Sequence, residues 1–141
     1  MNISNRVFSN NFWTATPYKR LSRRVEVQPL FRGNRIYRKT TAYLHGHAIA
    51  IFEELEDENI LSISLSGWHT PLTVGALNAL LECRRWKLRK GRLVAPSGRS
   101  KELPMYGWTI VEDPELNQDN PGQWRLFPEW GRDYNERCPQ P

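Results

Sequence analysis

Three alternating segments decide the fold of this 141-residue chain: residues 36–44 are IYRKTTAYL, residues 48–52 are AIAIF, and residues 60–66 are ILSISLS. Successive side chains of a strand point to opposite faces of a sheet, so alternation of this kind predicts strands with one buried face. The His-Gly-His link at 45–47 suits a tight turn between the first two segments. We therefore expect an antiparallel β-meander of three strands.

A helix is predicted directly after the meander. Thr70 can cap its first turn, Pro71 suits the first helical position, and residues 72–83 continue with Gly75 as their single breaker. Residues 85–94, RWKLRKGRLV, then predict a β-hairpin about a Lys-Gly turn. The expected fold class is α+β: an antiparallel meander of about five to six strands in β-β-β-α-β-β order, packed by one α-helix, the last strand coming from residues 106–111.

Composition divides the chain into three parts. Residues 1–34 alternate Asn, Ser, Arg and isolated aromatic residues, and we expect a basic N-terminal arm, extended, with one short strand at 24–28. Residues 35–111 form the α+β domain, and residues 112–141 form an acidic tail that contains Pro and Trp and is only partly ordered. A sheet with exposed edges and a free arm favours self-association into a homo-oligomer.

Charge is distributed in alternating blocks. Residues 1–50 carry a net charge of +8 and residues 84–101 also +8, whereas residues 51–83 carry −6 and residues 102–141 carry −5. Fifteen of the 20 basic residues are Arg, which suits bidentate phosphate contacts and stacking on planar rings. Together with six Trp residues, this pattern favours a nucleic acid as the partner.

Two groups of residues are the candidate nucleic-acid-binding site, because cations track a phosphate backbone while aromatic rings stack on bases. The hairpin group consists of Arg85, Lys87, Arg89, Lys90 and Arg92. The group on the first strand consists of Arg35, Tyr37, Arg38, Lys39 and Tyr43, with the two tyrosines as stacking residues. The predicted helix is apolar, which disfavours reading of a duplex major groove. The pattern leaves DNA and RNA open.

Enzyme signatures are missing from the sequence: it has no phosphate-binding loop, dinucleotide fingerprint, nucleophile elbow or zinc-protease motif. Cys83 has no neighbouring base and suits a buried structural position on the helix. His45 and His47 would need a third ligand, such as His69, to hold a metal. The acidic residues between 53 and 58 suit a solvated loop. We expect a protein that is not an enzyme and has no catalytic residue, cofactor or metal.

The compartment follows from what the sequence lacks. No run of about 18 apolar residues is present, so we expect no membrane span and no membrane partner. The first residues lack the pattern of a signal peptide. Two cysteines, Cys83 and Cys138, cannot form a disulfide framework, which favours the cytoplasm.

A motif links the meander to the helix. Residues 67–73, GWHTPLT, followed by Leu77-Asn78, resemble small phage-encoded proteins in which a β-meander ends in G-W-x-T-x-x-T and a helix with Leu-Asn follows. The resemblance covers about residues 40–95. The small size, the basic aromatic sheet and the lone helix are also similar to the Drc-type family of phage single-stranded-DNA-binding cofactors of RNA polymerase. The motif residues suit structural roles: Gly67 for the turn, Trp68 for packing under the helix and Thr70 for the cap.

The resulting hypothesis is a non-enzymatic protein that binds single-stranded DNA with little sequence preference. The resemblance implies a dimeric or tetrameric phage protein in the host cytoplasm that acts in transcription or replication, with host RNA polymerase as a partner. The alternative is a phage protein that binds and inhibits or redirects a host enzyme such as RNA polymerase without needing DNA, through the acidic tail or the aromatic arm. A duplex-binding repressor is a third reading.

Overall fold

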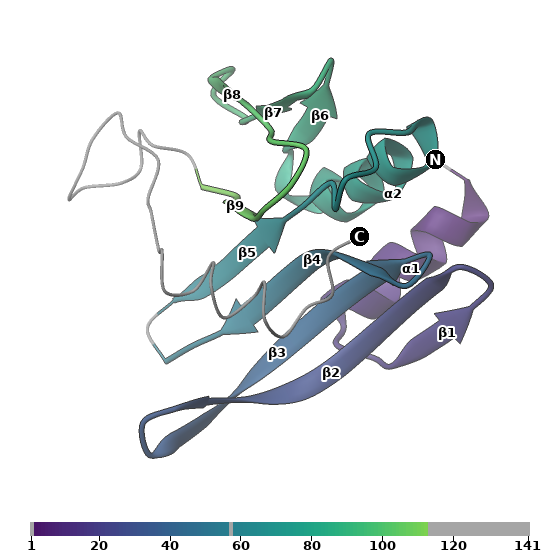
Figure 1. Cartoon of the computed structure of the whole chain (residues 1–141). Helices are drawn as coiled ribbons and strands as arrows, with labels where there is room; N and C mark the ends of the chain where they lie inside the picture. The colour runs from purple at the N-terminus through teal and green to yellow at the C-terminus, as the bar shows by residue number, and fades with distance from the viewer. Residues whose placement is uncertain (1, 57, 113–141) are drawn as a thin grey trace.

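The computed structural model describes residues 2–56 and 58–112. Within them the chain is α+β, as predicted, with a six-stranded antiparallel sheet, a separate three-stranded sheet and two α-helices (Figure 1). The larger sheet contains, in spatial order, β1 (Tyr18–Arg20), β2 (Arg23–Arg32), β3 (Arg35–Leu44), β4 (His47–Glu54), β5 (Asn59–Ile63) and β9 (Thr109–Ile110). Each strand is antiparallel to its neighbours.

The alternating segments of the sequence correspond to β3, β4 and β5. On the face toward the helices, Ala42, Ile49, Leu61 and Ile63 belong to one hydrophobic core. A β-bulge between Ala42 and Tyr43 shifts the register of β3 against β4. Figure 1 shows β2 and β3 as a long hairpin whose tip extends beyond the other strands. The described part of the sheet therefore combines a packed centre with a projecting hairpin.

The second helix begins as the sequence predicts. α2 (Pro71–Leu81) has Thr70 as its N-cap, whose hydroxyl accepts a hydrogen bond from the Thr73 N–H at 3.3 Å. Leu77, Leu80 and Leu81 are buried, as their spacing on one helical face requires. The helix ends at Leu81, and the turn η1 (Glu82–Arg84) continues it as a 3₁₀ helix.

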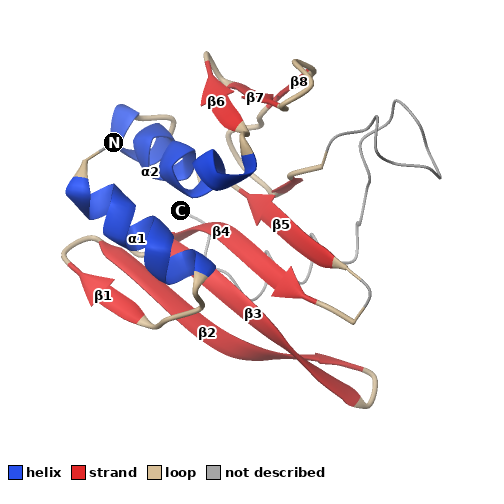
Figure 2. Cartoon of the chain, turned by 180° about the vertical axis from the view of Figure 1, so that it is seen from behind, coloured by secondary structure: helices blue, strands red, loops and turns tan. Residues whose placement is uncertain are grey.

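The N-terminal residues are not an extended arm. Ile3–Trp13 form the helix α1, and Phe8 and Phe12 are completely or almost completely buried in the same core as α2. The Ser9 hydroxyl donates to the Ala79 carbonyl at 3.0 Å, and the Trp13 indole N–H donates to the Leu80 carbonyl at 2.9 Å. Figure 2 shows both helices on the same face of the larger sheet. α1 is thus part of the folded unit that the sequence predicted to begin at residue 35.

The strand predicted at 24–28 is also longer than expected. β2 continues beyond residue 28, the predicted end, and runs through Pro29. β1 pairs only with residues 23–25 of β2, so β2 is an edge strand at Pro29. An edge strand tolerates a residue that lacks an N–H donor, and the strand therefore continues to the hairpin tip.

The predicted hairpin forms in a different place from the one expected. β6 (Lys87–Arg89) and β7 (Arg92–Val94) pair with β8 (Ser100–Glu102) in a separate three-stranded sheet rather than extending the meander. Trp86, Leu88 and Leu93 bury its inner face in the core beside α2. The short strand β9 lies within the segment predicted as a strand at 106–111 and pairs with β5. The predicted tail, apart from Glu112, lies outside the described residues.

Candidate nucleic-acid interface

The β6–β7 hairpin presents its basic residues to solvent. Lys87 and Arg89 are exposed on the outer face, whereas Leu88 between them is buried. Lys90 and Gly91 form the turn with φ of 52° and 76°, the positive values that a tight two-residue hairpin turn requires. Arg89 is directly opposite Arg92 in the register, so the strand alternation places Lys87 and both arginines on one face.

Arg85 precedes the hairpin instead of belonging to β6. It ends η1 in the left-handed conformation with φ of 64°, and its N–H donates to the Glu82 carbonyl at 3.0 Å. Its side chain is exposed like those of the hairpin. This left-handed residue turns the chain between η1 and β6, so Arg85 lies just before the basic face of the hairpin.

The hairpin cations are not neutralised by carboxylates of the described chain. Across residues 2–56 and 58–112, no ion pair involves Arg85, Lys87, Arg89, Lys90 or Arg92. Arg92 donates to the Ser100 hydroxyl at 2.9 Å, and its register partner on β8 is Glu102. Several uncompensated positive charges on one small face produce a positive potential that attracts anions.

A groove adjoins this face. It has a volume of about 750 Å³ and lies between the start of α1, α2 and β6. Arg85, Lys87 and Arg89 line it together with the amide side chains of Asn2, Asn5 and Asn78. Glu82 is the one carboxylate among the described residues that line it.

Asn78 fixes the wall of this groove. Its amide nitrogen donates to the Leu88 carbonyl at 3.2 Å, and its amide oxygen accepts from the Leu88 N–H at 2.7 Å. These two bonds hold β6 against α2. The groove therefore has its cations on a strand that is fixed to a helix, which suits an anionic polymer.

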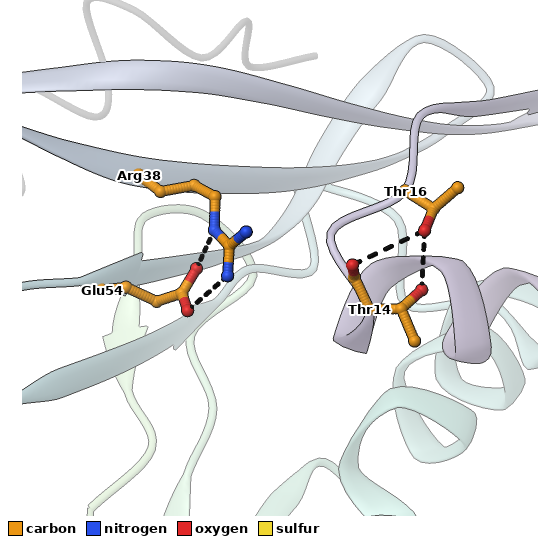
Figure 3. A network of polar contacts seen from close by, with 4 residues as sticks. All are labelled: Thr14, Thr16, Arg38 and Glu54. Atoms are coloured by element: carbon orange, nitrogen blue, oxygen red, sulfur yellow. Dashed lines mark hydrogen bonds and ion pairs between the residues drawn. The ribbon is translucent and has the colours of Figure 1, made fainter.

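The cations on β3 have carboxylate partners. Arg38 forms a bidentate ion pair with Glu54, with 2.7 Å between Nη2 and Oε1 (Figure 3), and Arg35 pairs with Glu56. The hydrogen bonds to these carboxylates raise the pKa of both arginines. The sequence placed the acidic residues in a loop, but Glu53 and Glu54 belong to β4, where the antiparallel register sets Glu54 opposite Arg38.

The other residues of the candidate group on the first predicted strand, which is β3, are partly or wholly inaccessible to solvent. Lys39 is only 4 % exposed and Tyr43 only 5 %, and the Arg24 guanidinium lies 4.2 Å from the centre of the Tyr43 ring. Tyr37 is half-buried, with its hydroxyl 3.5 Å from Glu56 Oε2. Tyr43 therefore cannot stack on a base in this structure. Figure 1 also shows the β2–β3 tip and the β6–β7 hairpin at opposite ends of the molecule, so the two groups do not form one track.

One exposed aromatic residue was assigned a different role by the sequence analysis. Trp68 was expected to pack under the helix, but it is 50 % exposed and stacks on His47, with ring centroids 5.8 Å apart and an interplanar angle of 29°. It lies in the turn between β5 and α2, outside either element. This position in a turn was the signal in the sequence that Trp68 could be exposed, because a turn residue does not belong to the buried face of a strand or a helix.

The metal-ligand and cysteine candidates of the sequence can be located in the described ranges. Residues 2–56 and 58–112 contain no cluster of three or more His, Cys, Asp or Glu side chains able to hold a metal. Cys83 is exposed rather than buried as expected, and partial desolvation raises the pKa of its thiol. A thiol with a raised pKa stays protonated near neutral pH and is a poor nucleophile.

Neither described helix is long and apolar enough to cross a membrane. The chain matches no protein-family model, and neither a curated protein nor a solved structure is significantly similar to it.

Proposed function

We propose that this protein binds single-stranded DNA with little sequence preference and is not an enzyme. The observation that carries the proposal is the outer face of β6–β7, where exposed cations without carboxylate partners in the described chain border a groove of about 750 Å³. Such a face attracts phosphates without reading base edges. The binding residues are Arg85, Lys87, Arg89, Lys90 and Arg92.

A single strand fits this surface better than a duplex. A major-groove reader needs an exposed helix with several basic or amide side chains aimed at base edges. α2 contains no basic residue and buries most of its length. α1 has a single basic residue, Arg6, and three Asn residues, of which Asn5 is buried, and it packs Phe8 and Phe12 into the core. A flexible strand, in contrast, can follow the short basic sheet into the groove.

The setting comes from the resemblance described above. Drc-type phage proteins are single-stranded-DNA-binding cofactors of RNA polymerase, so we assign this protein to phage transcription or replication in the host cytoplasm. Self-association into a dimer or tetramer would align several basic faces along one strand.

The direct test compares two double charge reversals of equal net charge. Lys87→Glu/Arg89→Glu removes the unpaired cations, and Arg35→Glu/Arg38→Glu removes cations that are paired with carboxylates. Binding of a fluorescent oligothymidine is measured by anisotropy at low salt. We expect the hairpin variant to lose binding and the β3 variant to retain most of it. Equal losses would reject the hairpin as the site, and no binding by the wild-type protein would reject the function.

A specific observation also favours a second function, contact with a protein. At the tip of the projecting β2–β3 hairpin, Phe31 and Ile36 are cross-strand partners and are 61 % and 67 % exposed. An exposed apolar pair at a projecting tip is typical of a protein-binding surface. This pair gives the alternative function, a protein that inhibits or redirects a host enzyme such as RNA polymerase, a candidate site. Phe31 belongs to the predicted arm of residues 1–34, whereas the start of that arm, Ile3–Trp13, is the packed helix α1. Loss of binding to purified bacterial RNA polymerase in a Phe31→Ser/Ile36→Ser variant would support it.

A further inference from the structure

A second, apolar pocket lies beside the Trp68 side chain. It has a volume of about 360 Å³ and is bordered by the β3–β4 turn, the end of the β5 segment and the start of α2. His47, Leu65, Trp68 and Leu72 are among the residues that line it. Trp68 and Leu72 are both substantially exposed at its rim. The pocket is therefore an apolar recess with an aromatic ring at its mouth.

The backbone holds Trp68 in this outward position. Ser66 and Gly67 have φ of 52° and 81°, which turns the chain sharply after the β5 segment. The Gly67 N–H donates to the Met105 carbonyl at 2.8 Å, the Trp68 N–H donates to the Leu65 carbonyl at 2.9 Å, and the Ser66 hydroxyl donates to the Ala48 carbonyl. Because the backbone is fixed and the ring stacks on His47, little further conformational entropy is lost when a ligand stacks on the indole.

The Trp68 pocket lies next to a recess at the turn of the basic hairpin. Another surface recess, of about 550 Å³, is lined by His69, Lys90, Gly91 and Arg92. Leu65 lines both recesses. His69 also approaches the hairpin turn closely, because its Cε1 would lie 3.6 Å from a Cβ placed on Gly91. Residues 65–69 thus border both the Trp68 pocket and the recess at the hairpin turn, which places the two recesses next to each other.

We propose that the Trp68 pocket binds a nucleobase of the strand whose phosphates lie on the β6–β7 face. This inference rests on the proposed function and adds the stacking site that Tyr37 and Tyr43 were predicted to supply. His47 already occupies one side of the indole, so the base stacks on the exposed part of the ring. An indole can stack on any of the bases, since every base has a π-face. This suits binding with little sequence preference.

Two oligomers of equal length test the proposal: oligothymidine, and an abasic deoxyribose-phosphate chain with the same number of phosphates. We expect Trp68→Ala to weaken binding of oligothymidine about ten-fold or more and to leave binding of the abasic chain unchanged. Trp68→Phe, which keeps a ring, should restore most of the affinity and also guards against a folding defect. Phe31→Ala is the matched control, an exposed aromatic residue on the distant hairpin tip.

The outcomes separate the two claims. If the wild-type protein binds both oligomers and Trp68→Ala weakens both equally or neither, the nucleobase pocket is wrong while the proposed function stands. If the wild-type protein binds neither oligomer, both claims fail. If Phe31→Ala reproduces the base-specific loss, stacking at Trp68 is not its cause and the pocket is again wrong.

Discussion

Neutralising two hairpin cations should change the salt dependence of DNA binding by a predictable amount. Five exposed cations without ion pairs in the described chain lie in or beside the hairpin. Each phosphate contact to a single strand contributes about −0.7 to the slope of log K against log salt, so five contacts give a slope of about −3.5. Lys87→Gln/Arg89→Gln should reduce that slope to about −2.1. Glutamine is chosen because it removes charge without adding repulsion.

The surroundings of Arg92 give a second value for the wild-type slope. Arg92 is hydrogen-bonded to Ser100 and has Glu102 as its register partner, and without its contact the wild-type slope is about −2.8. The difference in slope between the wild-type protein and the double variant is about 1.4 whether or not Arg92 makes a contact, because each of the two substitutions removes one phosphate contact. In affinity terms, a rise from 50 to 200 mM salt should weaken the wild-type complex roughly a hundred-fold and the variant complex roughly twenty-fold.

The assay is anisotropy of a labelled oligothymidine across that salt range, with Arg35→Gln/Arg38→Gln as the control. The control removes the same charge from guanidiniums that are paired with Glu56 and Glu54, so its slope should match that of the wild-type protein. A variant slope equal to the wild-type slope would refute the assignment of Lys87 and Arg89 as phosphate contacts. A larger change in the control would show that the β2–β3 hairpin, and not β6–β7, is the binding surface.

Two further predictions concern the folded unit itself. Phe8→Ala should lower the free energy of unfolding by about 3–5 kcal/mol in urea denaturation, because the ring is fully buried between α1 and the core; a loss below about 1 kcal/mol would contradict the packing of α1. In a Cys138→Ser background, Cys83 should react with iodoacetamide at pH 8 more slowly than free cysteine, since partial desolvation raises its pKa and lowers its thiolate fraction. A rate at or above that of free cysteine would show that the thiol is not desolvated.

The elements that the sequence predicted well are those whose side-chain pattern is determined locally. β3, β4 and β5 show the two-residue alternation, and α2 has both a capping Thr70 and Pro71 at its start. α1 was missed because five of its eleven residues are Asn or Ser, which are weak helix formers. The signal that could have identified it was the spacing of Phe8 and Phe12, since residues four apart lie on one helical face.

The solvent accessibility of the predicted binding residues was harder to predict from the sequence than the strands and the helix α2. The hairpin charges could be predicted as exposed because Trp86 and Leu88 alternate with them and need burial. For Arg38, accessibility depends on Glu54, a residue 16 positions away that only the β3–β4 register brings into contact. Alternation also placed Lys39 and Tyr43 on one face, but it cannot show whether that face meets solvent. Both side chains are buried.

These differences explain why two surfaces of similar composition have different prospects as binding sites. On the β2–β3 hairpin, an anion would first have to displace the carboxylates of Glu54 and Glu56, and the gain from the new contact is reduced by the loss of the old one. On the β6–β7 hairpin, Lys87 and Arg89 have no such partner among the described residues, and their mutual repulsion is relieved when phosphates bind. The same number of cations therefore yields more binding free energy on β6–β7. The state of charge pairing, more than the count of basic residues, is the reason for proposing β6–β7 as the interface.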